Sequence, residues 1–206
     1  MTERGRWIVI LLLGVALTSR IQAEDILTQY DLLVPESHEF AIRYDVSATN
    51  SGSSIYFNII RPGSTVRDEK VFDRATGKEI KFEMSNGKEA KEQGQAEPDT
   101  ADETPFIKAF LPHPVPVDGE FRIRILKTYK DAKSYFIDGD TIVFDRSLSI
   151  KRNVIILPAG YELIASTVPV MVSTESGGRI KVSLINDRDD EIAVKITGRR
   201  LKRAVK

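Results

Sequence analysis

A short apolar run in the second half of the chain constrains the fold more than any other feature of the sequence. Residues 154–157 read VIIL, with charged residues before them and the turn sequence PAG at 158–160 after them. Four apolar residues, three of them β-branched, that end at a proline and a glycine are typical of a buried central strand rather than a helix. We therefore expect residues 141–172, which surround this run, to form buried sheet.

The turn at residues 158–160 predicts a tight corner. Pro158 fixes its own φ angle, and Gly160 can adopt a positive φ at little cost. The chain then continues through residues 161–168, which we expect to return beside or across from the first strand. The sequence from Leu157 to Tyr161 is similar to the tyrosine corner of Greek-key sandwiches, in which a tyrosine hydroxyl bonds upstream backbone. A plain turn followed by a half-buried tyrosine is the alternative.

Elsewhere the apolar residues recur with a period of two, which is the period of a strand. The alternation is clear in residues 40–46, 55–60 and 121–129, and residues 70–84 indicate a hairpin with its turn at 73–77. No segment shows a convincing helical stripe. About a dozen short strands with frequent turn signals predict an all-β fold, an antiparallel β-sandwich of the immunoglobulin-like or Greek-key type. A closed barrel is the alternative fold.

One segment breaks this pattern. Residues 85–105 hold six carboxylates and two lysines, and no aromatic or branched aliphatic side chain. Such a segment cannot bury enough apolar surface to order itself. We interpret it as a mobile acidic loop within a single sandwich domain of residues 24–200. A linker between two small β domains is the alternative.

The first 23 residues have the pattern of a secretory signal peptide. Arg4 and Arg6 precede an apolar stretch at residues 7–17, and residues 21–23 offer a cleavage site. Eleven apolar residues are too few to span a bilayer as a helix. We therefore expect export to the periplasm or the medium after cleavage, with no transmembrane span in the mature chain. An uncleaved anchor is the alternative.

Charge and cysteine content exclude several classes of function. Loss of residues 1–23 removes three arginines and one glutamate from the 30 cations and 30 acids of the chain, which leaves a net charge of about −2. This balance gives no long-range attraction to nucleic acid. The chain has no cysteine, which rules out disulfides, thiolate nucleophiles and zinc–cysteine sites.

Candidate catalytic and metal-binding residues are few. Only His38 and His113 could serve as histidine bases, and neither has a neighbouring acid or histidine at a metal-ligand spacing, so we interpret both as surface residues. Calcium prefers carboxylate oxygens in loops, which makes two acidic turns weak candidates for a calcium site. Their candidate ligands are Asp138, Asp140, Asp187 and Asp189. Aspartate is also an ordinary turn residue, so we expect no metal and no cofactor.

The basic end of the chain is a further candidate for binding. Residues 199–206 carry five cations, and residues 201–206 form a basic tail beyond the expected domain. Such a tail could contact anionic lipid or polysaccharide. A solvated chain end is the simpler interpretation.

These observations together favour an exported, non-catalytic β-sandwich that acts as a binding or scaffolding module in the cell envelope. Its partner would be an envelope protein or a polysaccharide. Two alternatives remain: a hydrolase that uses carboxylates or a spatially assembled triad, and a carbohydrate-binding module whose exposed tyrosines stack on sugars. The tyrosines considered are Tyr30, Tyr56, Tyr129 and Tyr135.

Overall fold

The computed structural model describes residues 26–201, and in this part of the chain nearly all regular structure is β. The largest sheet has seven strands in the order β12-β13-β10-β1-β2-β7-β4. In chain order these strands are β1 (Leu27–Leu32), β2 (Glu39–Ala48), β4 (Thr65–Asp73), β7 (Phe121–Lys130), β10 (Arg152–Ile156), β12 (Met171–Thr174) and β13 (Ile180–Ile185).

Two smaller sheets complete the fold. A four-stranded sheet has the order β11-β14-β9-β8, and a three-stranded sheet has the order β3-β6-β5. Their strands are β8 (Tyr135–Asp138), β9 (Thr141–Leu148), β11 (Tyr161–Ser166) and β14 (Ile192–Arg200), and β3 (Ile55–Ile59), β5 (Phe82–Asn86) and β6 (Pro105–Phe110). A 3-10 turn, η1 (Pro35–Ser37), follows β1, and one short helix, α1 (Gly87–Glu92), follows β5.

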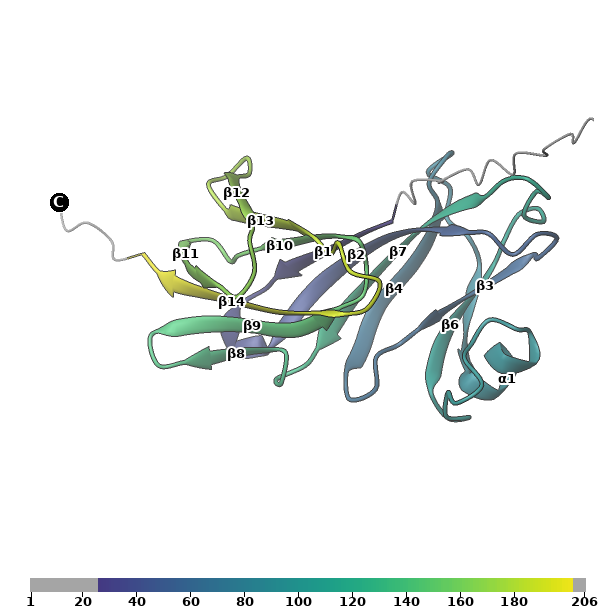
Figure 1. Ribbon diagram of the computed structural model, residues 1–206, viewed down its shortest axis with the longest axis horizontal. Helices are drawn as coiled ribbons and strands as arrows, with labels where there is room; N and C mark the ends of the chain where they lie inside the picture. The colour runs from purple at the N-terminus through teal and green to yellow at the C-terminus, as the bar shows by residue number, and fades with distance from the viewer. Residues whose placement is uncertain (1–25, 202–206) are drawn as a thin grey trace, which may run out of the picture.

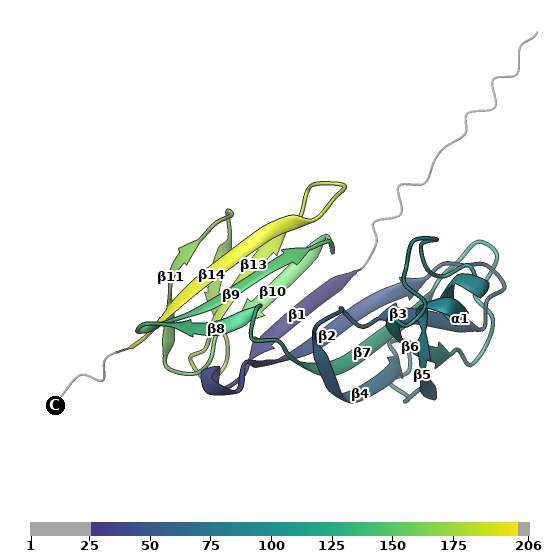
Figure 2. The same ribbon diagram turned by 90° about the horizontal axis from the view of Figure 1, so that it is seen from below.

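The two smaller sheets cover the same face of the seven-stranded sheet, one toward each end (Figure 1). Figure 2 shows from another side that β8, β9, β11 and β14 lie at one end of the molecule, and β3, β5, β6 and α1 at the other. The main apolar core draws buried side chains from all three sheets, including Phe40 of β2, Phe144 of β9 and Ile107 of β6. The all-β sandwich expected from the sequence is therefore confirmed.

The apolar run that organises the sequence is a buried central strand. Ile155, Ile156 and Leu157 are each no more than 1% exposed, and β10 lies between β1 and β13 in the seven-stranded sheet. The pairing of β10 with β1 is parallel, an exception to the antiparallel order that we expected. After the turn, β11 pairs with β14 in the four-stranded sheet, across from β10 rather than beside it.

A tyrosine hydroxyl does bond upstream backbone, but it belongs to Tyr135 rather than Tyr161. The fully buried Tyr135 donates a hydrogen bond from its hydroxyl to the carbonyl of Leu33 (2.9 Å). This bond connects the start of β8 to the end of β1. It fixes the four-stranded sheet to the end of the central strand of the seven-stranded sheet.

Of the hairpin expected at residues 70–84, the turn is present but the paired arms are not. Its turn is present, with Gly77 at a positive φ and its amide donating to Asp73 (2.8 Å). The two arms, however, separate after a single bridge between Phe72 and Glu79. One arm is β4, and the other becomes β5 in the three-stranded sheet.

Residues 85–105, interpreted from the sequence as a mobile acidic loop, contain the end of β5 and helix α1. The side chain of Asn86 caps the helix by accepting a hydrogen bond from the amide of Glu89 (3.0 Å). Lys91 donates to Asp102 and to the carbonyl of Thr100 (2.7 Å each), which holds the return of the loop. The helix cap and the ion pair order this segment, although it has no large apolar side chain to bury.

The expected signal peptide and residues 202–206 of the expected basic tail lie outside the described residues. Within residues 26–201 there is no helix of the length and apolarity that crossing a bilayer requires.

Candidate functional site

The candidate site is a cavity where the three sheets meet, and its floor is the inner face of the seven-stranded sheet. The register of β1, β2 and β7 aligns Tyr30, Ile42 and Lys127 in one row across this face. The next row contains Phe40 and Tyr129. Residues paired across neighbouring strands point to the same face. Lys127 therefore points toward the apolar core side of the sheet.

Lys127 is the unusual member of this floor. It is 6% exposed, and its ammonium group donates to Oδ1 of Asn58 (2.7 Å) and to the carbonyl of Ile59 (3.4 Å). Both acceptors are neutral. In the described part of the chain, no carboxylate lies within ion-pair distance of this ammonium group. Burial, together with the positive charge of Arg146, lowers the pKa of Lys127 to about 7.

A β-bulge in β4 lies directly opposite Lys127. Arg67 pairs with Thr128 and Lys70 pairs with Leu126, so two residues of β4 face the single residue Lys127. Asp68, within the bulge, has a left-handed backbone (φ 59°). A bulge interrupts the ladder and turns side chains away from their regular positions. The negative charge of Glu69 acts on Lys127 and partly offsets the lowering of the lysine pKa.

The walls of the cavity come from the two smaller sheets. One wall comes from β3 and the turn after it, and consists of Asn58, Ile59, Arg61 and Pro62. Residues 146–150 with Glu191 form the other wall. The cavity has a volume of about 400 Å³, which falls in the range of small-molecule sites in proteins. The site is thus assembled from segments that are far apart in the sequence.

A second buried cation, Arg146, lies in the wall formed by β9. It is 7% exposed, and its guanidinium group packs against the rings of Tyr30, Phe40 and Tyr129 at 5.3–5.9 Å from their centroids. Its Nη1 donates to Asp131 (3.3 Å) and to the hydroxyl of Ser134 (3.2 Å). Asp131 therefore neutralises much of the charge of Arg146.

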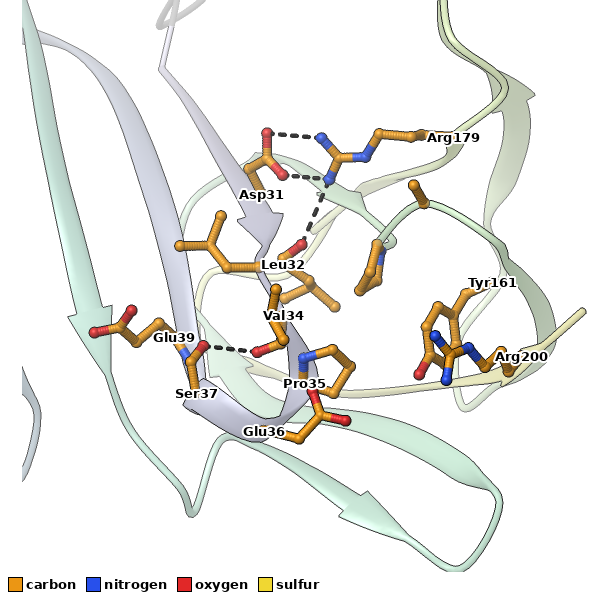
Figure 3. Close-up of a pocket in the computed structure, with 13 residues that line it drawn as sticks. Asp31, Leu32, Val34, Pro35, Glu36, Ser37, Glu39, Tyr161, Arg179 and Arg200 are labelled. Carbon is orange, nitrogen blue, oxygen red and sulfur yellow. Dashed lines mark hydrogen bonds and ion pairs between the residues drawn. The ribbon is translucent and has the colours of Figure 1, made fainter.

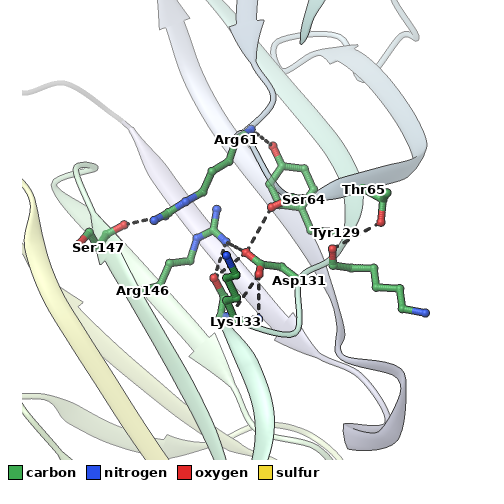
Figure 4. A network of polar contacts seen from close by, with 10 residues as sticks. Arg61, Ser64, Thr65, Tyr129, Asp131, Lys133, Arg146 and Ser147 are labelled. Carbon is green, nitrogen blue, oxygen red and sulfur yellow. Dashed lines mark hydrogen bonds and ion pairs between the residues drawn. The ribbon is translucent and has the colours of Figure 1, made fainter. Parts of the chain in front are cut away.

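Arg61 supplies a third cation at the edge of the cavity. Figure 4 shows its backbone amide donating to the hydroxyl of Tyr129 (3.1 Å) and its guanidinium group reaching the carbonyl of Ser147 (3.3 Å). Burial raises the pKa of Tyr30 to about 12, so its hydroxyl stays neutral at physiological pH. The cavity thus combines three cations, neutral phenols and the acid Glu191, an arrangement suited to a negatively charged group.

The alternative to an anion site is a purely structural role, in which Lys127 only satisfies backbone groups of β3. β3 is an edge strand of the three-stranded sheet, and side chains satisfy the backbone groups of its open edge. Gln95 donates to the carbonyl of Ile55 (3.0 Å) and accepts from the amide of Phe57 (3.1 Å). Lys127 likewise donates a hydrogen bond to the carbonyl of Ile59. A neutral donor such as glutamine can fill this role, as Gln95 does, so edge protection alone does not account for a buried cation.

A second, larger cavity lies at one end of the molecule (Figure 3), with a volume of about 620 Å³. Arg179 pairs there with Asp31, one of its two contacts measuring 3.2 Å, and Glu39 pairs with Arg67 outside the cavity (2.8 Å). Much of the remaining lining is apolar, with Val34 and Pro158 among its residues. Arg179 and Asp31 are partly exposed and neutralise each other, so this cavity offers less specific chemistry than the cavity around Lys127.

The structure places most sequence-derived candidates away from the cavity. His38 has a left-handed backbone after η1, and its ring bonds the carbonyl of Tyr135 (3.0 Å). His113 is exposed, with its ring 5.0 Å from that of Phe121. Among the described residues, no group of three or more histidines or acids could hold a metal ion. Asp138 and Asp140 are exposed in the β8–β9 turn, and Asp187 and Asp189 are exposed in the β13–β14 loop.

The tyrosines expected to be exposed are mostly buried. Tyr30, Tyr129 and Tyr135 are at most 6% exposed, and Tyr56 is half-buried. Their rings are therefore not free platforms for stacking on sugars. Two of them, Tyr30 and Tyr129, nevertheless line the cavity.

Sequence reasoning missed the residues that define the cavity, although a signal was present for one of them. Lys127 occupies the inward position between Ile125 and Tyr129 in the alternating pattern of β7. A charged residue in an inward position of a well-patterned strand indicates a buried polar site. Arg61 and Arg146 carried no comparable signal, because their positions depend on how the sheets pack.

No protein-family model matches the chain, and no curated protein matches it by sequence. Among solved structures, an aminopeptidase N family protein from Idiomarina loihiensis is similar with a TM-score of 0.46 and 11% identity, over 84% of this chain and 29% of that one. A Parabacteroides distasonis protein, described provisionally as a protease, gives a TM-score of 0.41 and 11% identity, over 84% of this chain and 39% of that one. With scores this low, these likenesses assign this chain no activity and no site.

Proposed function

We propose that this chain is a non-catalytic binding module of the cell envelope, which holds a negatively charged group of its ligand in the cavity around Lys127. The observation that carries the proposal is the burial of Lys127 without an acid partner. An unpaired buried cation costs free energy. Charged groups that proteins retain at such a cost cluster at functional sites, and an anion in the cavity would supply the missing counter-charge.

The lining of the cavity supports binding rather than acid–base catalysis. A glycosidase needs two carboxyl groups facing each other across the substrate, whereas the lining of this cavity includes the single acid Glu191. A serine triad needs a histidine base, and the rings of His38 and His113 lie elsewhere. Fixed cations and neutral phenols can hold and orient an anion without taking part in a reaction.

Anion-dependent stabilisation tests this function. We expect sodium acetate or sodium phosphate, compared with sodium chloride at equal ionic strength, to raise the melting temperature of the wild-type chain. A ligand at 100 times its Kd stabilises the folded state by about 2.7 kcal/mol. Lys127→Met should abolish the response, and Lys130→Met, at an exposed position of the same strand, should keep it. An equal response of all three proteins, or none in the wild type, would count against a ligand site here.

A second candidate function follows from the low pKa of Lys127. A buried lysine next to another cation can be a neutral nucleophile near pH 7 and can form an imine with a carbonyl compound. Reduction with borohydride in the presence of pyruvate, followed by mass spectrometry, distinguishes the two functions. A reduced adduct on Lys127 would favour an enzyme, whereas an unmodified Lys127 supports the binding module.

A further inference from the structure

We propose that the ligand is an acidic sugar, whose single carboxylate lies beside Lys127 and whose body extends past Tyr44 into the cavity next to α1. This inference rests on the proposed function, because it names the chemical class of the anion. Three features carry it: the net charge of the cavity, a second cavity that adjoins it, and the blocked backbone edge of β3.

The charge of the cavity matches one negative charge rather than two. Arg146 is already paired with Asp131. The remaining cations of the lining are Lys127 and Arg61, and the exposed acid Glu191 shares the lining with them. From outside the lining, Glu69 also acts on Lys127. A net charge of at most about +1 matches a monoanion such as a carboxylate. The second charge of a phosphate monoester would have no counter-charge, which is costly in a partly buried site.

The space for the rest of the ligand is an adjoining cavity of about 380 Å³, which shares Tyr44, Asn58 and Ile59 with the first. Its other walls come from Tyr56 and from residues 94–97, which follow α1. Phenol hydroxyls, amides and ring faces suit a neutral body rich in hydroxyl groups, because each polar group can find a partner while the ring lies on an apolar surface. A disaccharide acid would therefore contact both cavities.

The alternative is an extended peptide that places its terminal carboxylate at Lys127. Such a peptide would gain its affinity by adding a strand to the open edge of β3. Gln95 already occupies the backbone groups of Ile55 and Phe57 on this edge, and Lys127 occupies that of Ile59. A peptide could pair there only by displacing these side chains, so the edge disfavours a peptide ligand.

A panel of matched ligands tests the inference by titration calorimetry on the intact chain at pH 6.5. D-glucuronate, glucose 6-phosphate and D-glucose share a sugar ring and differ in charge. Cellobiouronate, a disaccharide of glucuronate and glucose with one carboxylate, tests the length of the ligand, and trialanine tests its class. We expect D-glucuronate to bind at least ten times more tightly than glucose 6-phosphate, D-glucose not to bind, and cellobiouronate to bind more tightly than D-glucuronate and trialanine. Ala96→Phe, which fills the second cavity, should reduce the affinity for cellobiouronate at least tenfold and leave that for D-glucuronate unchanged.

The outcomes separate the two proposals. Tighter binding of glucose 6-phosphate than of D-glucuronate would overturn the carboxylate inference but leave an anion site in place. Tighter binding of trialanine than of cellobiouronate would overturn the sugar class. If no member of the panel binds and acetate and phosphate also fail to stabilise the chain, the proposed function itself is wrong. An unchanged cellobiouronate affinity in Ala96→Phe would remove the second cavity from the site.

Discussion

Replacing Lys127 by methionine is expected to raise the free energy of unfolding at pH 6.5 by about 2 kcal/mol while abolishing anion binding. Lowering the pKa of Lys127 from 10.5 to about 7 corresponds to roughly 5 kcal/mol of unfavourable free energy for its charged form. Methionine fills a similar space without a charge, but it leaves Oδ1 of Asn58 and the carbonyl of Ile59 without their donor, at a combined cost of about 3 kcal/mol. Denaturant unfolding of both proteins measures the difference. A variant less stable than the wild type would mean that Lys127 supports the fold rather than the ligand.

The stability gained by Lys127→Met should depend on pH in one direction. Between pH 7 and 10.5 the unfolded wild-type chain keeps the proton on Lys127 and the folded chain does not. The unfolded state then binds more protons, so this group makes stability rise with pH, by at most about 1.4 kcal/mol per unit. The advantage of the variant is fully present below pH 7 and shrinks as the pH rises toward 10. A difference that stayed constant from pH 6 to pH 10 would show that the pKa of Lys127 is not lowered.

The second large effect is expected at Asp131, whose replacement by alanine should lower the free energy of unfolding by about 3–5 kcal/mol. Asp131 is the acid paired with Arg146 (3.3 Å), and removing one partner of a buried ion pair leaves the other charge uncompensated. Asp131 also accepts hydrogen bonds from the amides of Lys133 (3.1 Å) and Ser134 (3.2 Å). These bonds hold the turn between β7 and β8.

The ionisation of Asp131 is consistent with this role. Burial acts to raise the pKa of Asp131, but hydrogen bonds from Ser134 and Lys133 and the charge of Arg146 outweigh it, so the pKa lies below its ordinary value. Denaturant unfolding of Asp131→Ala, with the exposed Asp118→Ala as a control, measures the effect. A loss below 1 kcal/mol at Asp131 would mean that solvent or another acid compensates Arg146.

Much of the sheet structure could be predicted because strands follow local patterns. The alternation of residues 40–46 and the apolar run at 154–157 each gave a strand with the expected residues buried, among them Phe40, Ile42 and Ile155. Between residues 55 and 60 the pattern is ambiguous, because both alternating sets are partly apolar. In the structure Ile59 is 47% exposed, while Asn58 is buried and faces Lys127.

The cavity could not be predicted because it depends on how three sheets are placed together. Arg61, Lys127 and Arg146 come from different sheets or from the turn after one, and only the packing of the two smaller sheets on the seven-stranded sheet brings them to one cavity. The tyrosines illustrate the same limit. The sequence offered Tyr30 and Tyr129 as exposed tyrosines for stacking on sugars. Only the fold shows that they are buried and border a cavity.

The pKa of Lys127, measured by NMR through its ε-methylene group with and without D-glucuronate, tests the central claim most directly. The structure places this pKa at about 7 in the free chain, and a bound anion should raise it by at least one unit, because it favours the charged ammonium. Affinity should accordingly decrease as the pH rises above 7. A pKa near 10.5 in the free chain, or a low pKa that neither D-glucuronate nor any other anion changes, would contradict the assignment of this cavity as an anion site.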